Sequence, residues 1–275
     1  MNDQANNWVR FAPGDPVLKG VNWGGLKTLY IKEVRRFFKV QLQTVWAPSV
    51  TTLLYLAIFT VALGRGGRTV MGVPYANFIA PGLIVMAMMQ NAFANASFSL
   101  LVGKIQGNIV DYLMPPLSTG ELMAGLIGAA VTRAFLVGFA VWVVMLLWPG
   151  VSVEMHRPEL VLWFGLMGAL LLSFLGLLTS LWADKFDHAA AVTNFVVTPL
   201  SLLSGTFYSV KQLAPTFRQI SQANPFFYVI SGFRGGFLGA SDSPLLVGGV
   251  ALLVLNILLC ALCFLVLKSG WKIKN

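Results

Sequence analysis

Six long apolar segments run through this chain and limit what it can fold into. They cover about residues 45–63, 78–102, 122–147, 160–182, 189–208 and 244–267. A helix of about 20 apolar residues is long enough to cross the hydrocarbon core of a bilayer. Only 11% of the residues are charged, whereas about a quarter are charged in soluble domains. The sequence therefore predicts an all-α polytopic membrane protein with six transmembrane helices and no room for a soluble catalytic domain.

The residues before the first apolar segment divide into two parts. Residues 1–22 are polar and contain Pro13, Gly14 and Pro16, which predicts a flexible cytoplasmic tail. Residues 23–40 place apolar side chains near one helical face and Lys and Arg on the others, the pattern of a helix that lies in the plane of the membrane on anionic lipid. Residues 23–275 are therefore expected to form a single transmembrane domain in contact with membrane lipids.

The distribution of Lys and Arg predicts the orientation of the chain. The compartment that holds both termini and the loops around Lys104 and Lys185 contains twelve Lys and Arg residues, and the opposite side contains six. Because positive charge is enriched in cytoplasmic loops, both termini are predicted to be cytoplasmic. The net charge of +9 thus reflects the excess of Lys and Arg on the cytoplasmic side, and no nucleic-acid partner is expected.

A polar segment, residues 104–121, separates the second apolar segment from the third. Its apolar residues Ile109, Tyr112 and Leu113 recur at helical spacing, so a short amphipathic helix is predicted from about residue 103 to the Pro115-Pro116 pair. Ser118 and Glu121 then have the spacing of a capping box, which predicts the start of the next helix. The short helix either lies among the lipid headgroups or contacts a soluble partner.

The segment between the fifth and sixth apolar stretches, residues 209–243, is too long for a turn. Residues 226–238 are apolar but too short to cross a bilayer, and they contain three glycines and Arg234. A pair of short helices dipping into the outer leaflet is predicted, since irregular backbone at that depth must be covered by protein.

Two groups of polar residues lie inside the apolar segments. Arg133 stands near the middle of the third, where it either pairs with Gln90, Asn91 or Asn95 or contributes to a transport path. The fifth carries small polar residues that either serve helix packing or form a semi-polar wall of such a path. Those assigned to the path are Asn194, Thr198 and Ser201.

Two motifs resemble those of a known family. The first reads Asp-Tyr-Leu-Met-Pro-Pro-Leu-Ser over residues 111–118, and the second begins at Asn224-Pro225 and contains Phe233-Arg234. Both resemble the membrane subunits of type-2 ATP-binding-cassette (ABC) exporters of bacteria, and the likeness extends from about residue 23 to residue 268.

The resemblance implies a homodimer in the inner membrane that binds two copies of a separate ATPase subunit. It implies that the polar loop, with Ile109, Asp111, Tyr112, Leu113 and Pro115, docks on the ATPase. It also implies that the first and fifth spans line the dimer seam and the substrate path. Asn224, Pro225 and Arg234 would belong to an external element that caps this path. The expected substrate is amphipathic: a lipid, a lipid-linked glycan or a drug.

No signature of catalysis accompanies these motifs. Gly20 and Gly25 have the spacing of a phosphate-binding loop, but Leu26 replaces the required lysine, so ATP and Mg²⁺ are expected on the partner subunit. His156 and His188 fall on opposite sides of the membrane in this topology and cannot share a metal. A channel or secondary transporter that works without an ATPase is the alternative, and a membrane enzyme would need a cluster of His, Asp or Glu at one interface.

Overall fold

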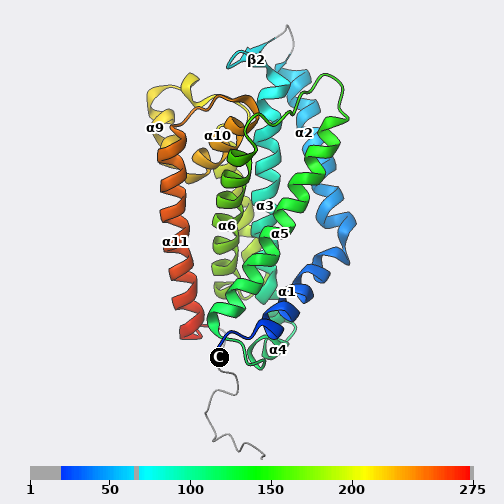
Figure 1. Cartoon of the computed structure of the whole chain (residues 1–275), viewed down its shortest axis with the longest axis vertical. Coiled ribbons are helices and arrows are strands. Elements are labelled where there is room, and N and C mark those ends of the chain that lie inside the picture. Colours follow the sequence, from blue (N-terminus) through cyan, green and yellow to red (C-terminus); the bar gives the residue numbers. More distant parts are fainter. Residues whose placement is uncertain (1–19, 65–67, 273–275) are drawn as a thin grey trace, which may run out of the picture.

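A computed structural model describes residues 20–64 and 68–272 of the chain, so most of the predicted tail, residues 1–22, lies outside the described residues. Within them, five helices are long and apolar enough to cross a membrane. They are η1–α2 (Leu42–Ala62), α3 (Tyr75–Ile105), α5 (Thr119–Leu146), α6 (Pro158–Trp182) and α11 (Leu245–Ser269). They stand side by side along the long axis of the molecule (Figure 1). The prediction of an all-α polytopic protein is confirmed.

Helix α3 forms the centre of the bundle, and most of its residues are buried. It packs against α6, α5, α2 (Ala47–Leu63) and α10 (Pro225–Leu238). At Gly176 of α6 the two backbones come so close that an added Cβ would lie 2.6 Å from the carbonyl oxygen of Phe93. Small residues thus allow close helix contact, as is usual in membrane bundles.

The fifth predicted span, residues 189–208, forms a helical segment made of α7 (Phe186–Val192), the π-helical η2 (Thr193–Val197) and α8 (Thr198–Leu203). It begins after Asp184, which pairs with Lys104 and Lys272 at one end of the bundle. It ends beside Asn224 at the other end, where the Asn224 side chain donates to the carbonyl of Leu200. The segment therefore runs from one end of the bundle to the other. That it crosses the membrane as a sixth span stays a prediction.

Helix α1 (Trp23–Phe38) forms where the amphipathic pattern predicts a helix, with Asn22 accepting from the backbone N–H of Gly25 as N-cap. It packs along α5 and slopes upward into η1 (Leu42–Trp46) and α2 (Ala47–Leu63) (Figure 1). Glu33 points into the protein and is fully buried. The helix thus turns one acidic side chain inward between its Lys and Arg residues.

The loop after α3 is less helical than predicted. Instead of one helix from about residue 103, α3 continues to Ile105, the chain turns at Gly107 with φ of 75°, and a single helical turn, α4 (Val110–Leu113), follows. The predicted helix was wrong because Gly107 adopts the left-handed conformation, which ends a helix. The capping box is confirmed, since Ser118 and Glu121 bond to each other's backbone N–H groups at the start of α5.

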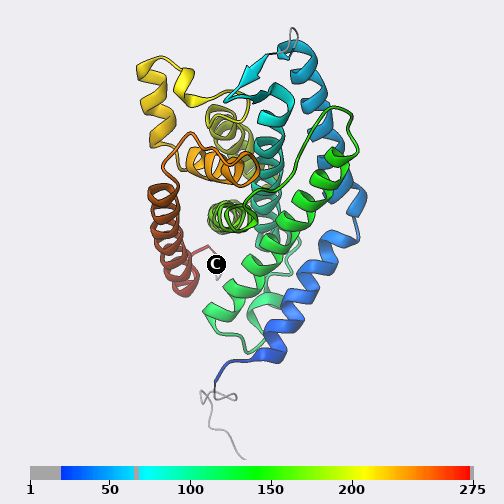
Figure 2. The same ribbon diagram turned by 45° about the horizontal axis from the view of Figure 1, so that its top comes forward.

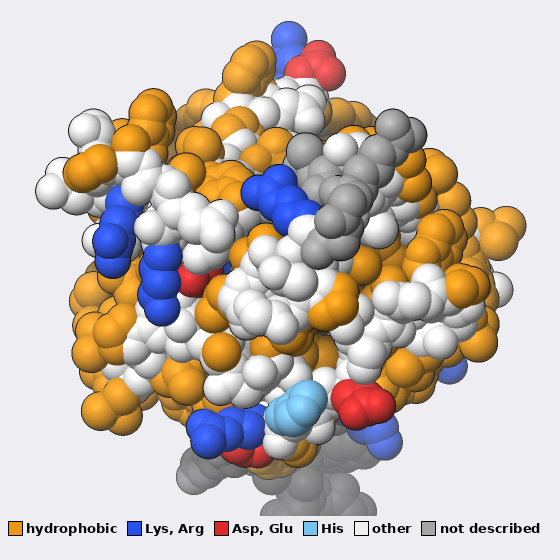
Figure 3. Space-filling model, turned by 90° about the horizontal axis from the view of Figure 1, so that it is seen from above, with side chains coloured by type: hydrophobic (Ala, Val, Ile, Leu, Met, Phe, Trp, Pro, Cys, Tyr) orange, Lys and Arg blue, Asp and Glu red, His pale blue; other side chains and the backbone are white. Residues whose placement is uncertain are grey.

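The opposite end of the bundle carries the remaining elements. A hairpin of β1 (Thr69–Val70) and β2 (Val73–Pro74) precedes α3. Between α8 and α11 lie η3 (Val210–Gln212), α9 (Pro215–Ala223) and α10 (Pro225–Leu238), which confirms the predicted short helices. Figure 2 shows α10 lying across the bundle axis. Seen onto this end, hydrophobic side chains form much of the perimeter and polar groups much of the centre (Figure 3).

Candidate functional site

The residues predicted to dock a partner lie on and beside α4, at the end of the bundle that also holds the C-terminal end of α11 (Figure 1). They do not share one face. The Tyr112 side chain is buried and Ile109 is half-buried, whereas Leu113 is 40% exposed and Met114 is 78% exposed. Asp111 and Pro115 are exposed as well. The outward apolar surface of this loop is therefore made by Val110, Leu113 and Met114, which we call the α4 surface.

Tyr112 is buried in an apolar cluster with Leu29 and Leu100, and it bonds to Glu33 of α1. Its hydroxyl donates to Glu33 Oε1 at 2.9 Å, and Lys32 Nζ lies 3.8 Å from the centre of its ring. Burial, and then the nearby carboxylate of Glu33, raise the pKa of Tyr112 above its usual value. The phenol therefore stays protonated and donates to Glu33 throughout the physiological pH range.

Glu33 also joins α1 to α3. Its Oε2 lies 2.9 Å from Arg36 Nη2 and accepts a hydrogen bond from Ser99 Oγ at 3.1 Å. We call Glu33, Arg36, Ser99 and Tyr112 the Glu33 network. Because these four side chains come from α1, α3 and α4, the network fixes α4 to the bundle. Sequence analysis missed Glu33 and Arg36, although a lone acidic residue within a run of Lys and Arg is a signal for such a pair.

A second set of contacts fastens the same end of the bundle. Lys104 Nζ donates to the carbonyls of Leu181 and Ala183 at 2.9 and 2.6 Å and lies 3.5 Å from Asp184. Lys272 Nζ bonds to the other carboxylate oxygen of Asp184 at 2.8 Å. The hydrogen bond from Lys272 contributes most to holding the pKa of Asp184 below its usual value. Asp184 thus ties the ends of α3, α6 and α11 together.

The residues predicted for a transport path do not form one hydrogen-bonded group among the described residues. Arg133 Nη2 donates to Asn91 Oδ1 of α3 at 2.8 Å, which is one of the pairings that the sequence offered. Ser201 is buried and bonds to the carbonyl of Val197, Thr198 is half-buried and Asn194 is exposed. No hydrogen bond joins Arg133 to any of these three among the described residues. Their role in transport stays a prediction.

Asn224 and Pro225 start α10. The Asn224 side chain caps the helix by accepting from Phe226 N, and its amide also donates to Ser204 Oγ at 2.7 Å. Pro225 occupies the first helical position, which needs no backbone N–H. These two residues therefore fix α10 to the end of α8.

Arg234 is a further residue that fixes the position of α10. It is 1% exposed and donates to the carbonyls of Phe78 and Gly205 at 3.1 and 2.7 Å. Its Nη1 lies 3.5 Å from Asp242 Oδ2, and the Asp242 side chain is also 1% exposed. The guanidinium therefore links α10 to α3 and to the segments that follow α8 and α10, which is an internal role that the sequence did not show.

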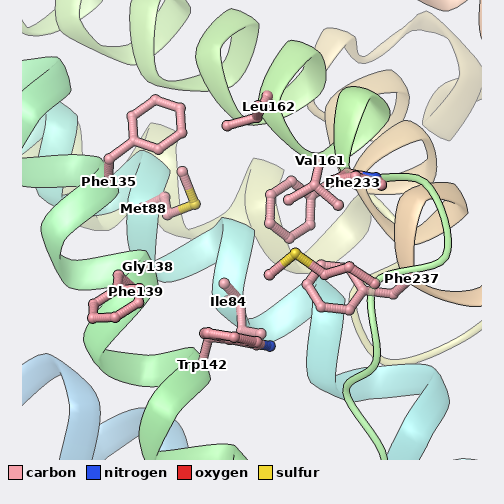
Figure 4. A pocket seen from close by; sticks show the side chains of 12 residues that line it. Ile84, Met88, Phe135, Gly138, Phe139, Trp142, Val161, Leu162, Phe233 and Phe237 are labelled. Carbon is pink, nitrogen blue, oxygen red and sulfur yellow. The ribbon is translucent and has the colours of Figure 1, made fainter.

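An apolar cavity of about 340 Å³ lies between α3, α5, α6 and α10 (Figure 4). Met88, Phe139, Trp142, Phe233 and Phe237 are among the side chains around it, and none of the described residues that line it is charged. Such a lining can hold hydrocarbon but supplies no group for acid–base or metal chemistry. Sequence analysis missed the cavity because its wall is assembled from four separate elements.

The sequence of this chain is similar to known proteins over most of its length. The family model described as ABC-2 type transporter matches residues 25–238. The inner membrane transport permease YadH of Escherichia coli K12 is 37% identical over 253 residues, which cover 92% of this chain and 98% of that relative. Nodulation protein J of Rhizobium leguminosarum bv. viciae is 25% identical over 226 residues, covering 80% of this chain and 83% of that relative. Nodulation protein J of Sinorhizobium fredii is 28% identical over 206 residues, covering 71% and 73%.

Proposed function

The chain belongs to the ABC-2 type transporter family, and from that membership we propose that it is the permease subunit of an ATP-driven exporter. It is a multi-pass protein of the inner membrane and a transport subunit, not an enzyme. In the proposed assembly two copies of the chain bind two copies of an ABC ATPase subunit, which carries ATP and Mg²⁺. The assembly moves an amphipathic substrate out of the cytoplasm or the inner leaflet.

The α4 surface is the observation that carries this proposal. Val110, Leu113 and Met114 are exposed apolar residues in a loop at the end of the bundle, beyond the long apolar helices. Exposed apolar residues that cluster in this way mark surfaces that bind a protein or a membrane, and we assign this one to a protein because it lies beyond the long apolar helices. The Glu33 network holds the loop in place, so a partner would meet an already formed surface, which lowers the entropic cost of binding.

Unpaired apolar faces support the proposed homodimer. On α2 the side chains of Val50, Leu54 and Ile58 are exposed, and on η2 Phe195 and Val196 are exposed. These are the first and fifth predicted spans, which line the dimer seam in the family resemblance. Polar residues beside them, such as Thr51 and Asn194, would allow hydrogen bonding between two copies.

The apolar cavity supports an amphipathic substrate. Its walls suit the acyl or ring portion of a lipid, a lipid-linked glycan or a drug, while Arg133 and the hydroxyl residues of α8 supply polar groups elsewhere in the bundle. The structure contains both kinds of surface within one membrane-spanning body.

Changing Leu113 to aspartate is expected to separate the permease from its ATPase. The new carboxylate would lose its hydration in the interface without gaining a partner, which costs several kcal/mol and weakens binding by about a hundredfold or more. Leu113 does not contribute to the Glu33 network, so the variant should still insert and dimerise. The measurement is recovery of the native ATPase with the tagged permease, at equal expression of variant and wild type.

Ile220→Asp is the matched control, because Ile220 is an exposed apolar residue of α9 at the opposite end of the bundle. It should retain the ATPase, and Asp111→Ala should weaken recovery less than Leu113→Asp does. Unchanged recovery and transport with Leu113→Asp would show that α4 is merely a surface turn. Failure of any ATPase to purify with the wild type would favour a channel or secondary transporter.

Labelling of introduced cysteines tests the proposed orientation. Cys260 and Cys263, the two native cysteines, are first replaced by alanine. Lys185 and Lys211 are both exposed and lie at opposite ends of the bundle, whereas Lys104 is too deeply packed for labelling. In intact cells a cysteine at position 211 should react with a membrane-impermeant maleimide and one at position 185 should not. The reverse pattern would overturn the assignment of cytoplasmic termini.

A further inference from the structure

Three buried N–H donors in one region of the bundle have no hydrogen-bond acceptor among the residues that the structure describes. They are Arg36 Nη1, Asn95 Nδ2 and Arg133 Nε. All three are donors, and Asn95 is 1% exposed. A buried donor without a partner is costly, so a region that gathers three of them calls for a ligand rich in acceptor oxygens.

The three donors belong to residues that lie on, or bond to, one face of α3. Asn91, Asn95 and Ser99 follow one another at four-residue spacing, so their side chains lie about one helical turn apart, or about 6 Å. Arg133 of α5 bonds to Asn91 Oδ1 at 2.8 Å. Arg36 of α1 bonds to Asn95 Oδ1 at 3.2 Å and to Ser99 Oγ at 3.0 Å. The two guanidinium groups are thus held on successive turns of the same helix.

The charge in this region is unbalanced. Glu33 pairs with Arg36 at 2.9 Å, but no carboxylate among the described residues pairs with Arg133. An isolated cation inside a membrane protein is expensive and usually marks a binding site. A guanidinium group matches the oxygen geometry of a phosphate, and charge-assisted hydrogen bonds are the strongest that the site could form.

We propose that Arg36, Arg133, Asn91 and Asn95 form a binding site for the phosphate group of a membrane lipid. One phosphate has enough oxygens to accept from the three unpaired donors while its charge balances Arg133. The Arg36 side chain is 28% exposed and Arg133 is half-buried, so the site is reached from outside the bundle. Arg36 lies near the C-terminal end of α1, the amphipathic helix whose Lys and Arg residues are expected to rest on anionic lipid, so a headgroup phosphate is the anion nearest to the site.

The test measures lipid retention by the full-length chain alone, without nucleotide or ATPase, so its outcome does not depend on the proposed export. The purified protein in nanodiscs of phosphatidylcholine doped with phosphatidic acid is compared, by native mass spectrometry, with one doped with diacylglycerol of the same acyl chains. The wild type should retain phosphatidic acid about tenfold or more over diacylglycerol, and Arg133→Gln should lose most of that preference. Arg133→Lys keeps the charge and should lose less.

Arg35→Gln is the matched control, because Arg35 is the exposed neighbour of Arg36 on α1 and its loss changes the net charge equally. It should leave retention unchanged. Equal retention of both lipids by the wild type would overturn the site even if Arg133→Gln failed to fold, and so would equal losses in Arg35→Gln and Arg133→Gln. Displacement of phosphatidic acid by inorganic phosphate would overturn the assignment to a lipid and indicate a site for the free anion.

Discussion

Replacing Arg234 with methionine is expected to lower the free energy of unfolding by about 3–5 kcal/mol, because it leaves the buried carboxylate of Asp242 without its counter-ion. The carbonyls of Phe78 and Gly205, which accept from Arg234 at 3.1 and 2.7 Å, would lose their donors at the same time. Methionine retains most of the aliphatic volume, so the loss reports on charge and hydrogen bonds more than on packing. Thermal unfolding of the purified protein in detergent provides the measurement.

Two further variants test whether the loss of the buried ion pair causes the loss of stability. Arg218→Met removes an exposed arginine of α9 and should change the stability little. Adding Asp242→Asn to Arg234→Met removes the stranded carboxylate charge and should recover part of the loss, since the two sites are coupled. An unchanged unfolding temperature in Arg234→Met, or equal losses in Arg218→Met and Arg234→Met, would contradict the role that we assign to the buried ion pair.

Replacing Glu33 with leucine is expected to release α4 from the bundle. The Tyr112 hydroxyl would lose its acceptor and Arg36 would lose its counter-ion, at a total cost of about 3 kcal/mol. This cost is at the lower end of the range that is usual for breaking a buried ion pair, because Arg36 is partly exposed and keeps other hydrogen-bond partners. Amide hydrogen exchange over residues 106–118 should accelerate, since local opening no longer has to break the Glu33 network. If α4 docks on the ATPase, recovery of that subunit should fall as well.

Asp111→Leu is the matched control for this change, since it removes an exposed acid from the same loop and introduces the same side chain. It should leave hydrogen exchange over residues 106–118 unaltered. Tyr112→Phe, which removes a single hydroxyl, should cost about 1 kcal/mol and accelerate exchange less than Glu33→Leu does. Slow exchange in Glu33→Leu would mean that apolar packing of Tyr112 and Ile109, and not the carboxylate, holds α4.

The sequence predicted the family, the helical class and several helix boundaries. Ser118 and Glu121 marked the start of α5, and short helices were expected in the segment before α11, where α9 and α10 lie. These features depend on local chemistry: a capping side chain reaches its own backbone, and a span must satisfy its own backbone hydrogen bonds in lipid. The length of each apolar segment is fixed by the thickness of the bilayer, so it can be read without knowing the neighbours.

The directions of the side chains were decided by the tertiary structure. Tyr112 was expected to face a partner, but it faces Glu33, which lies 79 residues earlier in the chain. Arg234, which was assigned to the external element, has a buried side chain that donates to the carbonyl of Phe78, 156 residues earlier in the chain. In lipid every helical face can be apolar, so periodicity in the sequence carries little information about which face packs inward. Contacts between distant segments make that choice, because a buried charge or donor takes the direction in which a partner from another helix can satisfy it.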